Sequence, residues 1–137
     1  MNPGNFRRLE GFAVLAASLA AYFALGGPVW LLLVLALAPD LSMVGYLAGP
    51  RVGAVVYNVG HVYALPLALG GLGVWFGVEL AVLGALVWAG HVGADRLVGY
   101  GLKYDTGFGD TDLTASVAEP GDSDSPALAF GAGCEGR

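Results

Sequence analysis

The sequence is poor in charge, in cysteine and in basic residues. Charged residues make up 12% of its 137 residues, against roughly 25% in ordinary soluble proteins. The single cysteine, Cys134, excludes a disulfide framework within the chain and fits a reducing compartment. Six Lys and Arg residues against eleven acidic ones leave no basic face for nucleic acid, so we expect no nucleic-acid partner.

The net charge of −5 comes from the C-terminal end of the chain. From residue 105 onward the only basic residue is Arg137, and the acidic residues there are Asp105, Asp110, Asp112, Glu119, Asp122, Asp124 and Glu135. Beyond Leu113 the composition turns to Ser, Asp, Ala, Gly and Pro, which is typical of disorder. We therefore predict one membrane domain over 1–113 and an acidic disordered tail over 114–137.

Apolar residues, 56% of the chain, are concentrated in four runs, at about 11–25, 29–48, 52–69 and 74–98. Each run approaches the roughly 20 residues that a helix needs to cross a bilayer. Helices are expected because the hydrocarbon core offers no water to backbone N–H and C=O groups. The pattern predicts an all-α fold, a membrane-embedded four-helix bundle whose partners are the lipid bilayer and possible further copies of the chain.

The basic residues give this bundle an orientation. With four spans, Arg7, Arg8, Arg51, Arg96 and Lys103 all fall on one side. The connections on the other side, around 26–28 and 69–73, contain no Lys or Arg. By the positive-inside rule we expect a multi-pass protein of the cell membrane with both termini in the cytoplasm.

Small residues recur at helical spacing within these spans. Ala16, Ala20 and Ala24 form one stripe, and Ala89 and Gly93 form another. Such stripes allow helices to approach closely in lipid.

Four ionisable residues lie inside the apolar spans: Asp40, His61, His91 and Asp95. Each costs several kcal/mol at membrane depth unless it is paired, ligated or facing a cavity. His61 lies roughly 15 Å along its helix from Arg51, and the other three fall at similar heights in the cytoplasmic half. His91 and Asp95 share a helix face at i, i+4 spacing. The four residues can therefore form one cluster.

Metal binding is the chemistry that such a cluster suits. Two imidazoles with one or two carboxylates are ligands for zinc, manganese or iron. We predict His61, His91 and Asp95 as metal ligands and Asp40 as a fourth ligand or general base. Asn58 shares a face with His61 and is predicted to support the metal ligands or to orient a substrate. The site would then be that of a metal-dependent, hydrolase-like enzyme.

Structural roles for the same residues stay open. Asp40 follows a proline and can cap the restarted half of a broken helix, or pair with His61 to fix helix register. Asp95 can pair with Arg51 at the cytoplasmic rim. In that case the chain is a structural or partner-binding membrane protein, or a small proton-linked carrier, and not an enzyme.

Glycine and aromatic residues alternate directly after the last span, over 99–113. Glycine permits the tight turns that such a segment needs. We expect it to fold back over the cytoplasmic mouth of the bundle, where Lys103 would meet anionic head groups or substrate. A plain interfacial anchor is the alternative.

Several blocks of residues also carry a family resemblance. They are Ala38-Pro39-Asp40-Leu41-Ser42-Met43-x-Gly45-Tyr46, Gly49-Pro50-Arg51-x-Gly53-Ala54, Tyr57-Asn58-x-x-His61 with Pro66, His91-x-Gly93-x-Asp95-Arg96-x-x-Gly99-Tyr100-Gly101-Leu102-Lys103-Tyr104, and Gly107-Phe108. Over roughly residues 9–113 the chain resembles a family of small prokaryotic integral membrane proteins, domain of unknown function 4260.

The resemblance implies a four-helix membrane protein and no established activity. Relatives are expected to have a histidine where this chain has Asp112, and a carboxylate there can replace a ligand or alter a proton carrier. A vaguer similarity links the Pro-Asp and His/Asp residues to membrane-bound metal-dependent hydrolases, which is an analogy only.

Overall fold

A computed structural model describes residues 2–104 and residue 111 of the chain. Its regular elements are α1 (Pro3–Ala24), α2 (Val29–Ala36), the 3₁₀ helix η1 (Pro39–Ala48), α3 (Pro50–Gly60), α4 (Ala64–Phe76) and α5 (Glu79–Val98). One isolated antiparallel bridge joins Lys103 to Thr111. The all-α prediction is confirmed, and the predicted tail over 114–137 lies outside the described residues.

Prolines divide the two middle segments into bent units. Pro39 starts η1 three residues after the last residue of α2, and Pro66 lies in the first turn of α4. Proline has no N–H to donate, and its ring clashes with the carbonyl four residues earlier, so the α-helix cannot run through either position. The described chain therefore has four helical units: α1, α2–η1, α3–α4 and α5.

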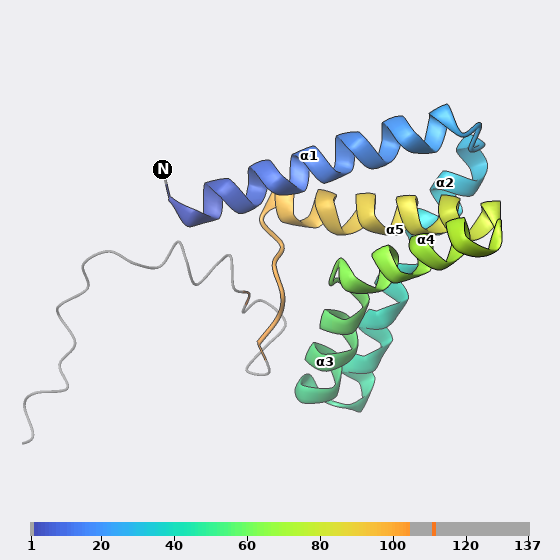
Figure 1. Ribbon diagram of the computed structural model, residues 1–137. Helices are drawn as coiled ribbons and strands as arrows, with labels where there is room; N and C mark the ends of the chain where they lie inside the picture. The colour runs from blue at the N-terminus through green and yellow to red at the C-terminus, as the bar shows by residue number, and fades with distance from the viewer. Residues whose placement is uncertain (1, 105–110, 112–137) are drawn as a thin grey trace, which may run out of the picture.

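The units do not form a straight bundle. Figure 1 shows α1 and α5 side by side, with α4 next to α5, and these pairs make close contacts. The hairpin of η1 and α3 projects at an angle from this layer, and its two helices pack mainly against each other. The two bends, before η1 and after α3, therefore lie next to α5.

Glycine makes the contact between α1 and α5 close. A Cβ added to Gly93 would lie 2.7 Å from the carbonyl oxygen of Gly11, and one added to Gly11 would lie 2.6 Å from that of Gly93. The small-residue stripe with Gly93 thus packs as expected. The stripe of Ala16, Ala20 and Ala24 does not, because all three are exposed.

The turn between α4 and α5 lies later than the sequence suggests. A connection was expected at 69–73, but α4 continues to Phe76 and ends at Gly77, whose φ of 69° is left-handed. Gly70 and Gly73 serve packing instead of a turn, since an added Cβ would lie 3.1 Å and 3.0 Å, respectively, from the nearest atoms of α5. Clustered glycines favour close helix approach in lipid as readily as they favour a turn.

Three helical segments are long and apolar enough to cross a membrane, at Val29–Ala48, Pro50–Phe76 and Glu79–Val98. Large apolar side chains face outward on them: Trp75 is 84% exposed and Leu47 89%. In a protein surrounded by water such a surface would be an aggregation hazard, whereas in a bilayer it contacts lipid. The four-span count and the cytoplasmic termini stay predictions.

Candidate functional site

The four ionisable residues of the spans meet at the corner between α5 and the η1–α3 hairpin. Nε2 of His91 lies 3.2 Å from Oδ1 of Asp40 and 3.7 Å from Oδ2 of Asp95. Nε2 of His61 lies 3.8 Å and 3.4 Å from the same two oxygens. Each carboxylate thus faces both imidazoles, and we call these four residues the His/Asp cluster.

The two helix bends supply half of the cluster. Asp40 lies in the first turn of η1 and His61 directly follows α3. Asp40 was a candidate helix cap, but the residue at the cap position is Ala38, and Oδ1 of Asp40 lies near the imidazoles. Broken helices place side chains and free backbone groups inside a membrane protein, which an unbroken helix cannot do.

His61 is held in one tautomer. Its Nδ1 lies 2.8 Å from the carbonyl oxygen of Tyr57, which can only accept, so Nδ1 carries a proton and donates it. The Tyr57 ring stacks on the imidazole with centroids 3.8 Å apart and 10° between the planes. Nε2 therefore points at the two carboxylates from a fixed ring that is 3% exposed. This backbone-held arrangement is common among metal-binding histidines.

The nitrogens that face the carboxylates have no hydrogen bond. Within the described chain, Nε2 of His61 and Nε2 of His91 are both buried without a hydrogen-bond partner. Buried polar atoms nearly always have a hydrogen-bond partner, so these two nitrogens need an explanation. The ligand atoms of Asp40, His61 and His91 lie within 4.8 Å of one another, and this triad can hold a metal ion.

Asp95 has a hydrogen bond of its own. The Tyr57 hydroxyl donates to its Oδ2 at 3.3 Å. The same tyrosine thus holds His61 by its ring and carbonyl and Asp95 by its hydroxyl. Side-chain exposure differs between the two carboxylates, at 45% for Asp40 and 22% for Asp95.

Asn58 holds the segment that follows α5. Its Nδ2 donates to the Lys103 carbonyl at 2.8 Å, and its Oδ1 accepts from the Lys103 N–H at 2.7 Å. The described part of the Gly/aromatic segment therefore folds back against α3, as the sequence suggests. The predicted role of Asn58, to support the metal ligands or to orient substrate, stays a prediction, and its amide pairs with this backbone.

Lys103 lies inside the fold at this point. It is 6% exposed, and its Nζ sits 4.8 Å from the centre of the Tyr57 ring. Burial lowers the pKa of its amino group, and the nearby charge of Asp95 partly opposes that shift. The expected contact of this side chain with head groups or substrate stays a prediction. Asp112 lies outside the described residues.

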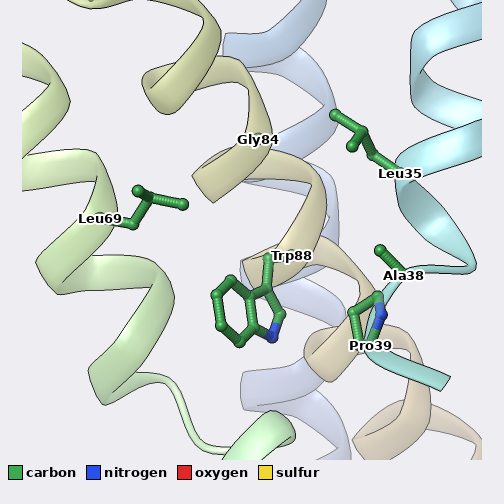
Figure 2. Close-up of a pocket in the computed structure, with 6 residues that line it drawn as sticks. All are labelled: Leu35, Ala38, Pro39, Leu69, Gly84 and Trp88. Atoms are coloured by element: carbon green, nitrogen blue, oxygen red, sulfur yellow. The ribbon is translucent and has the colours of Figure 1, made fainter. Parts of the chain in front are cut away.

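Trp88 is a supporting residue that the sequence analysis did not single out. Its Nε1 donates to the Gly60 carbonyl at 2.6 Å, which satisfies a backbone group at the end of α3. Figure 2 shows its ring between Leu69 and Pro39, in an apolar groove of about 210 Å³. The sequence offered one signal for this role: Trp88 lies in the middle of a span, away from both membrane interfaces, and a buried indole N–H there needs an acceptor.

Comparison with known proteins gives one match. The family model described as "Domain of unknown function (DUF4260)" matches residues 5–115, which is most of the chain and includes the whole cluster. The comparisons with curated proteins and with solved structures find no match. The chain belongs to the DUF4260 family.

Proposed function

We propose that the chain is a four-span membrane protein that binds one divalent transition metal through Asp40, His61 and His91. Its termini face the cytoplasm, and the four units are α1, α2–η1, α3–α4 and α5. The distribution of Arg and Lys supports this orientation. The triad that can hold a metal supports the binding site.

The spacing of the cluster is the observation that carries the proposal. An imidazolium that donated directly to a carboxylate would lie about 2.7–2.9 Å from it, but the four N–O distances are 3.2–3.8 Å. Ligands held about 2.0–2.1 Å from a tetrahedral metal lie about 3.4 Å from one another. The four N–O distances are those of ligands around a cation, and a cation between the imidazoles and the carboxylates would give both buried Nε2 atoms a partner.

Hydrolysis is the reaction class that this donor set supports. A bound divalent ion would supply Lewis acidity and a nucleophile at neutral pH. Asp95, held by Tyr57, is positioned to accept the proton of an attacking water. The sequence predicts Asp40 as a fourth ligand or the base and Asp95 as a ligand; here Asp40 is the ligand and Asp95 the base. Zinc, manganese and iron all suit two nitrogens and one oxygen.

Elemental analysis tests the metal site. The full chain is purified in detergent without chelator and without a polyhistidine tag, and metal is counted per chain. We expect about one zinc, manganese or iron per wild-type chain and less than a tenth of that in His91→Ala, because one of three ligands is lost. Cys134→Ser is the control for adventitious thiol binding and is expected to keep the metal. A metal-free wild type that stays metal-free on incubation with each ion contradicts the proposal.

Proton relay is the second candidate, because carboxylates and imidazoles that face one another in alternation can also share protons. It predicts metal-free protein that carries a pH-dependent flux in liposomes. Wild type and His91→Ala would then differ in flux, and neither would hold metal.

A further inference from the structure

A second apolar groove runs along α5 and ends at the cluster. It has a volume of about 280 Å³ and lies between α1, α2 and α5. Tyr22, Leu32 and Leu86 line one end, and Ala36, His91 and Ala94 line the other. Along α5 the lining residues span eight positions, or about 12 Å of helix. Apart from the buried phenol of Tyr22, its one ionisable lining residue is His91, a member of the triad that can hold a metal.

Helix α2 leaves this groove open to the surroundings of the protein. All eight residues of α2 are apolar, yet none of them is buried. Leu33, on the rim of the groove, is 63% exposed. In the membrane, a surface of this kind is covered by lipid or by another helix. The shape of the groove decides between them.

A groove of about 280 Å³ is too small for a helix, which is about 10–12 Å across. A single hydrocarbon chain is narrow enough to lie in it. One end is mainly apolar, with the Tyr22 hydroxyl bonded to the Pro28 carbonyl, and the other reaches an imidazole beside a carboxylate that is 45% exposed. An amphiphile matches this polarity, with its chain along α5 and its head near His91 and Asp40. A divalent ion held by the triad would offer an open coordination position to a phosphate oxygen of such a head group.

We propose that this groove binds one acyl chain of an anionic membrane phospholipid and brings the head group of that lipid to the cluster. The inference rests on the proposed function, because the metal gives the head group its place. It names the substrate class as a lipid that enters sideways from the bilayer. The methyl end of the chain would lie near Tyr22 and the carbonyl end near His91.

Photo-cross-linking tests the groove. The full chain is placed in nanodiscs that contain phosphatidylglycerol with a diazirine near the methyl end of one acyl chain, and labelled residues are mapped by mass spectrometry. We expect labelling centred on Leu32 and Leu86, the partly exposed residues at that end. Ala36→Phe puts a ring into the groove beside His91 and is expected to lower this labelling about tenfold, because several buried methylene groups lose their site.

Two variants accompany Ala36→Phe. Ala68→Phe makes the same change at an exposed alanine of α4 outside this groove, and it is expected to leave the labelling unchanged. Leu33→Trp covers the rim from an exposed position and serves if Ala36→Phe does not fold; it is expected to lower the labelling as well. Equal labelling in the wild type and in whichever filled variant folds overturns the proposal.

Metal content separates the two claims. Ala36→Phe is expected to keep its metal and lose its lipid, which supports the groove proposal. Labelling at the groove in a protein that never holds metal contradicts the metal site and also the lipid head-group placement. Full metal content with labelling scattered over all exposed helix faces overturns the groove alone.

Discussion

Helix α5 meets α1 and the η1–α3 hairpin in opposite ways. On one face Gly93 touches the backbone of Gly11, and both α1 and α5 run unbroken past the contact. Two residues earlier, on a roughly opposite face, His91 meets Asp40 at the bend before η1. The first interface uses small residues and continuous helices. The second uses ionisable residues and helices that stop.

The interface between α1 and α5 supports the fold, whereas the corner at His91 forms the candidate site. Close packing of small residues gives α5 a fixed position without polar groups in lipid. That fixed helix carries His91 and Asp95 to a corner where the partner helices break and free Asp40 and His61 to face them. A cluster of ionisable groups needs such a rigid frame, because displacement of one ligand leaves the others as uncompensated polar groups in the membrane.

The largest expected effect is on the α1–α5 interface. Gly93→Val puts a branched side chain where even a Cβ would lie 2.7 Å from the Gly11 carbonyl oxygen. We expect the free energy of unfolding to fall by about 3 kcal/mol or more, measured by thermal or steric-trap unfolding in detergent. Gly71→Val is the matched control, since a Cβ there meets nothing within 4 Å. Equal stability of the two variants would show that the close contact is not what holds α5.

The carboxylates should respond unequally at the other interface. Asp40→Asn removes a proposed ligand and is expected to weaken metal binding more than about 100-fold, whereas Asp95→Asn changes a neighbour of the metal and costs about tenfold. Titration of metal-free protein with zinc in detergent measures both affinities. If Asp95→Asn causes the larger loss, Asp95 is a ligand, as the sequence alone predicts, and Asp40 is the better candidate for the base.

Tyr57 offers a test of the support around the metal. Tyr57→Phe keeps the ring that stacks on His61 and the carbonyl that holds its Nδ1, and it removes only the hydroxyl that donates to Asp95. We expect metal affinity to fall by no more than about tenfold, with the unfolding temperature nearly unchanged. A complete loss of metal would mean that Asp95 is itself a metal ligand and that the Tyr57 hydroxyl holds it in place.

The smallest effect is expected at Asn58. Asn58→Ala removes two hydrogen bonds to the Lys103 backbone, each with a net value of about 1 kcal/mol. The segment after α5 should then be cut faster by a protease, while the metal stays bound. Unchanged proteolysis together with lost activity on lipid would favour the predicted substrate-orienting role.

The sequence predicts the helices and the gathering of the cluster, because both follow from hydropathy and helical spacing. Four ionisable residues at similar depth are costly in contact with lipid, so they are expected to face one another inside the protein. The position of the α4–α5 turn does not follow, since Gly73 packs against α5 while Gly77 makes the turn. Glycine alone does not distinguish the two uses.

The bends and the distant hydrogen bonds are the other part that the sequence leaves open. Pro39 and Pro66 mark interruptions, but the angle of the η1–α3 hairpin depends on tertiary packing. The Asn58–Lys103 pair joins residues 45 positions apart, beyond the reach of a helical pattern. The sequence shows that Tyr57 lies one turn before His61. Its contacts with His61 and Asp95 could be seen only in the structure.

X-ray absorption spectroscopy of the zinc-loaded full chain tests the central claim most directly. If the metal binds in the His/Asp cluster, we expect nitrogen and oxygen ligands at about 2.0–2.1 Å and the outer-shell scattering of two imidazole rings. In His91→Ala, the scattering of only one ring should remain. A sulfur ligand at about 2.3 Å, which only Cys134 or a methionine can supply, or a spectrum without imidazole scattering, would contradict a metal site in the His/Asp cluster.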